Sequence, residues 1–122
     1  MASRQQSGQE AENLARRHLE QHGLTLVTQN WRCRRGELDL IMLDGATLVF
    51  VEVRFRKHQE WGGALESVDS HKRGKLILAA QLFLQSESRW SRLACRFDVV
   101  AIQAGKLQIS PQLHWLKNAF DS

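Results

Sequence analysis

Apolar positions recur with a helical period in two parts of the chain. The first, residues 9–21, ends before Gly23 and has four apolar side chains on one face: Ala11, Leu14, Ala15 and Leu19. The second, residues 70–86, begins with Ser70 as the expected N-cap and carries a similar stripe of Leu76, Ala79, Ala80 and Phe83. Two amphipathic helices are therefore predicted.

Runs of β-branched and apolar residues predict the strands. Three precede the second helix, at 24–31, 36–43 and 47–55, with Asp44-Gly45 as a hairpin signal between the last two. Two more are predicted at 95–102 and, after a turn over 104–106, at 107–110. Residues 113–120 follow Pro111 and are expected to form a short helix or an irregular tail. The order αβββαβ(β) predicts a single α/β domain over residues 1–122, with a mixed central sheet flanked by helices.

Carboxylates interrupt two of these strands, although desolvating an unpaired carboxylate is costly. Alternate residues of a strand share a face, so Glu37, Asp39 and Ile41 should point the same way. The opposite face should carry three apolar side chains: Leu38, Leu40 and Met42. On the returning strand the more polar face carries Phe50, Glu52, Arg54 and Arg56.

A two-residue turn at Asp44-Gly45 would put Leu43 opposite Ala46. Position 39 then falls near position 50, and position 37 near position 52, so the acids of both strands should cluster on one face. Converging acids repel one another unless a cation lies between them. Two interpretations stay open: Mg²⁺ or Mn²⁺ with oxygen ligands, or a buried ion pair between Glu52 and an arginine.

The charge of the chain favours an anionic partner. The formal net charge is +4 and the pI about 9.6, with basic clusters at RRH, RCRR, RFRK and HKRGK. No apolar run is long enough to span a bilayer, and the N-terminus has no signal-like apolar stretch, so a cytoplasmic protein is expected. Two cysteines are expected to be reduced thiols.

The stretch GELDLIMLDGATLVFVEVRFR resembles the core of the PD-(D/E)XK nuclease superfamily, a restriction-endonuclease-like fold in which acids on two strands hold a metal. The whole chain is similar to the YraN-like (UPF0102) family, related to archaeal Holliday junction resolvases. Five blocks in order carry the resemblance: GQEAENLARRHLEQHG, RRGELDLI, FVEVRFR, SVDSHKRGKLILAAQLFL and CRFDVVAI.

The resemblance implies a Mg²⁺ or Mn²⁺ site on Asp39 and Glu52, with the carbonyl of Val53 as third ligand. Glu12 matches an acid that resolvase-like members place beside the metal. Helical spacing alone does not prefer Glu12 over Glu10, which lies at the other rim of the apolar stripe. Glu37 is expected to support the site, through water or an arginine. Asp98 is expected to be a structural partner of Arg96 or of a helix terminus.

One position departs from the family pattern. Arg54 stands where the nuclease mechanism uses a lysine, and arginine remains protonated and cannot act as a base, although it can stabilise negative charge on phosphate. Lys57, Lys72 or Lys75 could supply an amine instead, or could simply contact phosphate. Trp61 could stack on an unpaired base or anchor its own loop.

The implied activity is that of a metal-dependent, structure-selective DNA endonuclease of the Holliday junction resolvase-like type, with Glu12, Asp39, Glu52 and Arg54 as catalytic residues. The alternative is a nucleic-acid-binding protein on the same fold without catalysis. In either case the expected partner is branched or structured DNA, and a homodimer is expected by analogy alone. Phosphate contacts are expected from eight basic residues: Arg32, Arg34, Arg35, Arg56, Lys57, Lys72, Arg73 and Lys75.

Overall fold

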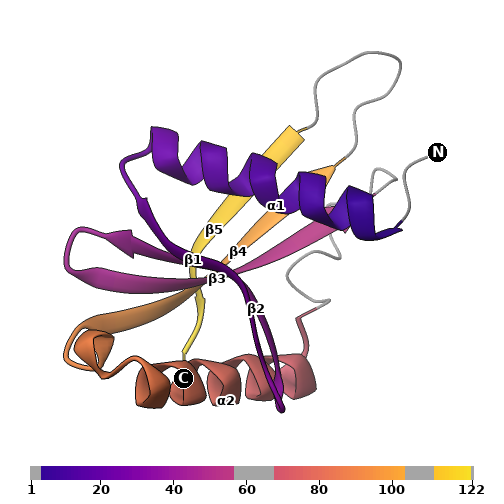
Figure 1. The fold of residues 1–122 in the computed structure, drawn as a ribbon. Coiled ribbons are helices and arrows are strands. Elements are labelled where there is room, and N and C mark those ends of the chain that lie inside the picture. The colour runs from indigo at the N-terminus through magenta and orange to yellow at the C-terminus, as the bar shows by residue number, and fades with distance from the viewer. Residues whose placement is uncertain (1–3, 57–67, 104–111, 122) are drawn as a thin grey trace.

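The computed structural model describes residues 4–56, 68–103 and 112–121. Its elements in chain order are α1 (Arg4–Gln21), β1 (Thr25–Cys33), β2 (Gly36–Asp44), β3 (Thr47–Arg56), α2 (Ser70–Ser86), the 3-10 turn η2 (Ser88–Trp90), β4 (Ala94–Gln103) and β5 (Gln112–Phe120). Figure 1 shows α1 and α2 on opposite sides of the sheet. No helix within the described ranges is long and apolar enough to cross a membrane.

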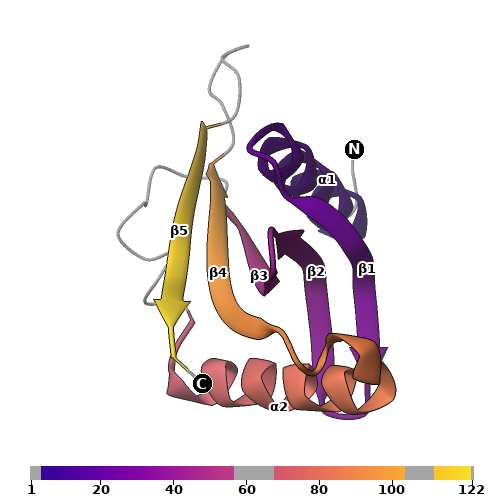
Figure 2. The same cartoon turned by 90° about the vertical axis from the view of Figure 1, so that its left-hand side faces the viewer.

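The five strands form one mixed sheet in the order β1-β2-β3-β4-β5. Neighbouring strands are antiparallel except for β3 and β4, which are parallel. A parallel pair needs a crossover connection, and α2 lies within that connection. Figure 2 shows the resulting three layers, with the sheet between the two helices. The prediction of a single α/β domain with a mixed, nuclease-like sheet is confirmed.

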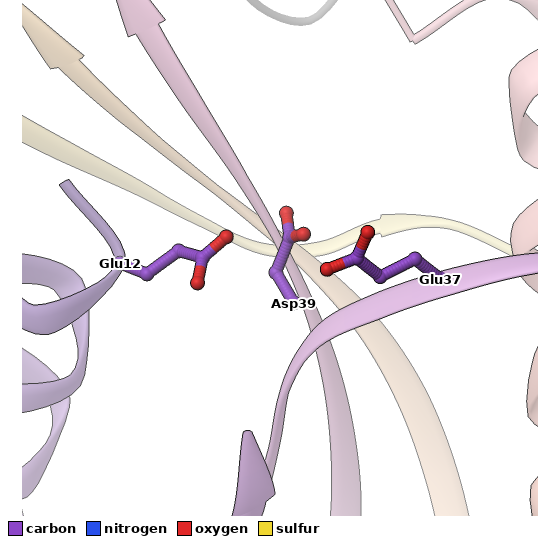
Figure 3. Close-up of side chains that lie close together, drawn as sticks. All are labelled: Glu12, Glu37 and Asp39. Atoms are coloured by element: carbon purple, nitrogen blue, oxygen red, sulfur yellow. The ribbon is translucent and has the colours of Figure 1, made fainter. Parts of the chain in front are cut away.

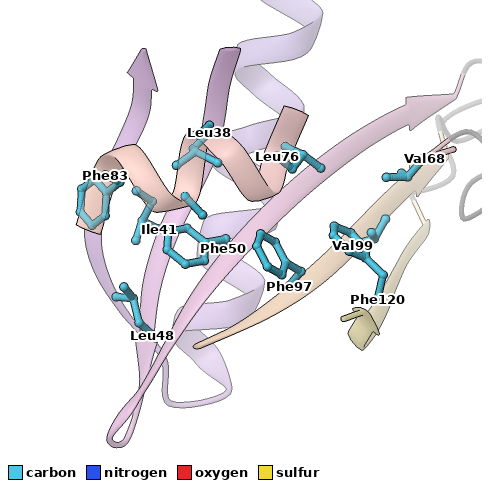
Figure 4. Packing of buried hydrophobic residues seen from close by; sticks show 12 residues of the cluster. Leu38, Ile41, Leu48, Phe50, Val68, Leu76, Phe83, Phe97, Val99 and Phe120 are labelled. Atoms are coloured by element: carbon cyan, nitrogen blue, oxygen red, sulfur yellow. The ribbon is translucent and has the colours of Figure 1, made fainter. Parts of the chain in front are cut away.

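Each helix packs on its own apolar cluster. The cluster under α1 joins the helix to the three inner strands β2, β3 and β4, through Ala11, Ala15, Leu19, Leu40, Met42, Val49, Val51, Val100 and Ile102. The cluster under α2 is richer in aromatic side chains, and Figure 4 shows it between α2 and the other face of the sheet. There Phe50 stacks on Phe97, which stacks on Phe120, with ring centroids 5.4 and 4.8 Å apart. The two clusters bury both faces of the sheet.

The helix predictions agree closely with the structure, with two corrections at the N-termini. The bounds of α2 are those predicted, whereas α1 begins at Arg4, five residues before the predicted start. The N-cap of α2 is Asp69 rather than Ser70, because the Asp69 carboxylate accepts a hydrogen bond of 2.9 Å from the Lys72 amide.

The prediction of a helix or irregular tail over residues 113–120 is wrong, since this segment is β5. Leu113, Leu116 and Phe120 have helix-like spacing, but they pack on different faces of the sheet. Residues three apart on a strand point to opposite faces, so regular alternation alone separates Leu113 from Leu116, and the register shift against β4 and the left-handed Asn118, with φ of 51°, lie between Leu116 and Phe120. The predicted turn over 104–106 and strand over 107–110 lie outside the described residues.

The predicted hairpin register is wrong by two residues. The observed pairs are Asp44 with Thr47 and Leu43 with Leu48, so the turn residues are Gly45 and Ala46. Gly45 has φ of 61°, a conformation that glycine adopts without strain. As a result Asp39 and Glu52 are the next two positions beyond the Leu40–Val51 pair, and Asp39 does not face Phe50.

Candidate metal centre

The candidate centre lies where β2 separates from β3. Ladder pairing between these strands stops at Leu40 and Val51. Beyond that point the Asp39 side chain takes the place of a strand partner, because its Oδ2 accepts a 2.9 Å hydrogen bond from the Val53 amide. This bond fixes a carboxylate at the point where the two strands part.

The separation also changes which way β2 side chains point. Leu38 and Ile41 belong to the α2 cluster, whereas Leu40 and Met42 belong to the α1 cluster. The prediction that Leu38, Leu40 and Met42 share one face is therefore wrong. A regular strand would alternate strictly, so β2 is irregular around Asp39, which lies between the two cores.

Three carboxylates converge at this irregularity. Glu12 from α1 and Glu37 and Asp39 from β2 each offer an oxygen, and the three oxygens lie within 4.8 Å of one another. Figure 3 shows Glu12 and Glu37 extending toward Asp39 from opposite sides. Within the described part of the chain, Glu12 Oε1 is buried and has no hydrogen-bond partner. Clustered oxygen ligands with a buried acceptor left unsatisfied suit a hard divalent cation.

Glu52 is not one of these three carboxylates, but it is next to Asp39. It is only 7% exposed, and its Oε1 is 3.8 Å from Lys72 Nζ on α2 and 3.9 Å from Arg54 Nε. The Asp39 and Glu52 carboxyl groups are also in hydrogen-bonding contact with each other. Glu52 therefore has an arginine partner, as the ion-pair interpretation expects, and it also adjoins the acidic cluster that the metal interpretation requires.

The site holds its protons more strongly than free carboxylates do. Burial, with repulsion from Asp39 as the next cause, raises the pKa of Glu52 to about 8, against the opposing effect of Lys72 and Arg54. Burial and then Asp39 raise the pKa of Glu12 to about 7. The pKa of Asp39 is also raised by burial, although the Val53 amide opposes this. Clustered carboxyl groups with raised pKa values are typical of functional sites.

The structure places the other predicted site residues as follows. The Val53 amide donates a hydrogen bond to Asp39, and the role of the Val53 carbonyl as a metal ligand stays a prediction. Glu37 does have the expected arginine, because Arg32 Nε lies 3.7 Å from its carboxylate. Lys57 and Trp61 lie outside the described residues, as does the side chain of Arg56.

The predicted phosphate-binding residues occupy different environments. Arg34 and Arg35 are exposed in the turn between β1 and β2, and Lys75 is exposed on α2. Arg73 instead has structural contacts: its Nε donates to the Val68 carbonyl at 2.7 Å, and its guanidinium lies over the Phe120 ring. Lys72 points toward Glu52, which places it beside the candidate centre.

A group of amide side chains beside Glu12 was missed by sequence reasoning. Gln29 donates to Asn13 at 3.1 Å and Asn30 donates to Gln9 at 3.3 Å, so amides tie β1 to α1. The carboxamides of Asn30 and Gln29 also lie close enough to Glu12 to favour its charged form. The polar pair Gln29-Asn30 within a predicted strand was the available signal.

The fold and the site together define the class: a small α/β domain with a nuclease-like mixed sheet and an acidic cluster beside the central strands. The model of the family described as "Uncharacterised protein family UPF0102" matches residues 11–102. The chain belongs to this family.

Curated relatives match this chain along nearly its whole length. A UPF0102 protein of Pseudomonas fluorescens is 68% identical over 98% of this chain and 97% of its own. One from Ectopseudomonas mendocina is 62% identical over the full length of both chains. One from Pseudomonas aeruginosa is 57% identical over 98% of this chain and 96% of its own.

Proposed function

We propose that the protein is a metal-dependent, structure-selective DNA endonuclease of the Holliday junction resolvase-like type. The observation that carries the proposal is the convergence of Glu12, Glu37 and Asp39 within 4.8 Å, with Glu52 in contact with Asp39. A protein that only binds DNA gains nothing from acids gathered beside its basic residues, since they repel phosphate. Hydrolysis of a phosphodiester gives such acids a role.

The donor set fits Mg²⁺ or Mn²⁺. Asp39 would hold the ion together with Glu12, Glu37 and Glu52, whose oxygens are hard ligands. The bound ion would lower the pKa of a water molecule and neutralise part of the negative charge on the phosphate. Asp39 is oriented for this by the Val53 amide, so the ligand is held before any ion arrives.

Two cations of the chain itself would act on the phosphate. Arg54 and Lys72 both lie within 4 Å of Glu52 Oε1, from β3 and α2 respectively. Arg54 cannot accept a proton, but it can stabilise negative charge as the phosphodiester is cleaved. Lys72 would supply the amine that the sequence lacks at position 54. The proximity of both cations to Glu52 supports this role.

A nucleic-acid-binding protein without catalysis is the second candidate. Arg54 in place of the lysine is the observation that favours it, because a base at that position is absent. The exposed Arg34 and Arg35 would serve this function equally well.

The test is cleavage of a matched panel of four-way, flapped, nicked and linear duplex DNAs with Mg²⁺ or Mn²⁺. We expect the wild type to cut branched molecules in preference to the linear duplex, and Asp39→Asn to cut none while it still binds DNA in EDTA. Binding without metal-dependent cleavage of any member would establish the non-catalytic candidate. Cleavage retained by Asp39→Asn would show that the acidic cluster is not the active site.

A further inference from the structure

A cleft of about 320 Å³ opens beside the acidic cluster, and the metal site does not use most of its wall. It lies between the first turns of α1 and the strands β1 and β2, and it is lined by Gly8, Gln9, Glu12, Asn30, Arg32 and Glu37. Glu12 and Glu37 belong to both the cleft and the cluster, so a group bound in the cleft would touch the proposed metal ligands.

From this arrangement we propose that the cleft binds one unpaired DNA base next to the phosphate to be cut. The inference rests on the proposed function and names its substrate class: DNA with a nucleotide free to leave the stack. A base inside a continuous duplex cannot enter a cleft of this size without being extruded. The volume is at the small end of ligand pockets and suits one nucleotide rather than a helix.

The chemistry of the wall favours a base over a phosphate. Glu12 and Glu37 would repel a phosphate, and among the described residues that line the cleft Arg32 is the only cation. Gln9 and Asn30 carry uncharged carboxamides, each with a donor and an acceptor, which match the mixed edges of all four bases. Their mutual hydrogen bond of 3.3 Å holds the two amides together across α1 and β1.

The backbone of the wall allows precise tests. Asn30 has φ of 56°, which glycine adopts readily, so Asn30→Gly removes the carboxamide and keeps the chain path. Asn118 provides a matched control, because it has φ of 51° on β5 and does not line the cleft. Gly8 has nothing within 4 Å of where a Cβ would lie, so Gly8→Leu should fill the cleft and also favour the helix.

The experiment measures affinity in EDTA for three labelled DNAs: a blunt duplex, the same duplex with one bulged nucleotide, and the same bulge without its base. We expect the wild type and Asn118→Gly to bind the bulged duplex about tenfold tighter than the blunt one. Asn30→Gly and Gly8→Leu should bring the two affinities within about twofold. The abasic bulge should behave like the blunt duplex.

Equal affinity of the wild type for blunt and bulged DNA would overturn the inference. So would a preference that survives in both cleft variants, or an abasic bulge bound as tightly as the intact one, since the cleft would then not hold the base. Because no turnover takes place in EDTA, these outcomes are independent of cleavage. Absence of cleavage on the branched panel would refute the endonuclease while leaving a base preference intact.

Discussion

The carboxylate of Glu52 is largely buried. Its two neighbouring cations, Lys72 and Arg54, do not fully offset the free-energy cost of removing its charge from water. The distances of 3.8 and 3.9 Å to Lys72 and Arg54 are long for ion pairs. Burial and the adjacent Asp39 dominate, which raises the pKa of Glu52 to about 8. At neutral pH without a cation, the carboxyl pair of Asp39 and Glu52 therefore retains a proton. A bound divalent cation would take the place of that proton.

The raised pKa gives Glu52→Gln a defined effect on stability. The folded-state pKa lies above the unfolded value of 4.5, so in EDTA the wild type loses stability as the pH rises from about 4.5 to about 8. Glutamine resembles the neutral form and avoids this loss. We expect Glu52→Gln to be as stable as the wild type at pH 5 and more stable at pH 8, by on the order of 3 kcal/mol.

Urea unfolding in EDTA at several pH values measures this difference. Glu20→Gln, at an exposed position on α1, is the control and should show no such trend. If Glu52 were instead chiefly an ion-pair partner, its loss would remove a stabilising negative charge from beside Lys72 and Arg54. Glu52→Gln would then be the less stable protein at pH 8.

Among the elements, β5 depends on one buried side chain of its neighbour β4. Asp98 is completely buried and accepts hydrogen bonds from Trp115 Nε1 and the Asn118 amide, both at 2.9 Å, and from Arg96 at 3.0 Å. The prediction of Asp98 as a structural partner of Arg96 is confirmed. These bonds hold the irregular part of β5 against the sheet.

Asp98→Ala should therefore destabilise the fold by about 4 kcal/mol, because it leaves the Trp115 indole N–H and the Asn118 amide without their acceptor and removes one of the two carboxylates that contact Arg96. Asp44→Ala removes the other carboxylate that contacts Arg96. The Asp44 carboxylate lies 2.9 Å from Arg96 Nη1 but is partly exposed, so its loss should lower the free energy of unfolding by about 1 kcal/mol. Denaturant unfolding compares the two variants. Equal losses would show that Asp98 is not the residue that holds β5.

The turn between β1 and β2 is the element we expect to meet the phosphate backbone. Each phosphate neutralised on duplex DNA contributes about 0.9 to the slope of log affinity against log salt concentration. Arg34→Gln combined with Arg35→Gln should therefore reduce that slope by about 2. The control is Arg89→Gln with Arg92→Gln, which removes the same charge from two exposed positions in and just after η2. An equal fall of the slope in both double variants would show that the turn between β1 and β2 does not contact the DNA specifically.

The elements differ in how far the sequence determines them. The bounds of α2 could be predicted because its apolar stripe and the preceding polar residues agree locally. Strand β5 could not be predicted, because the spacing of Leu113, Leu116 and Phe120 is typical of a helix. The hydrogen bonds from Trp115 and Asn118 to Asp98 of β4 depend on the tertiary structure. The hairpin register depended on which pair of residues near Gly45 forms the turn, and local sequence permits either pair.

The candidate centre is assembled from four elements of the fold: α1, β2, β3 and α2. The sequence, through its resemblance to a family, could indicate Glu12, Asp39 and Glu52 as a set. It could not indicate the departure of β2 from β3 that gives Asp39 the Val53 amide. The approach of Lys72 and the amides of Gln29 and Asn30 also depends on tertiary packing. Contacts between residues far apart in the chain leave no pattern in the local sequence.

Calorimetric titration of the metal-free protein with Mn²⁺ at pH 8 measures whether the assembled acidic cluster binds a divalent cation. We expect saturable binding at one site per chain by the wild type, weakened more than about tenfold in Asp39→Asn. Asparagine keeps an oxygen that can accept the Val53 hydrogen bond, so that variant should remain folded. No saturable heat from the wild type, or equal binding by Asp39→Asn, would show that the acidic cluster is not a cation site.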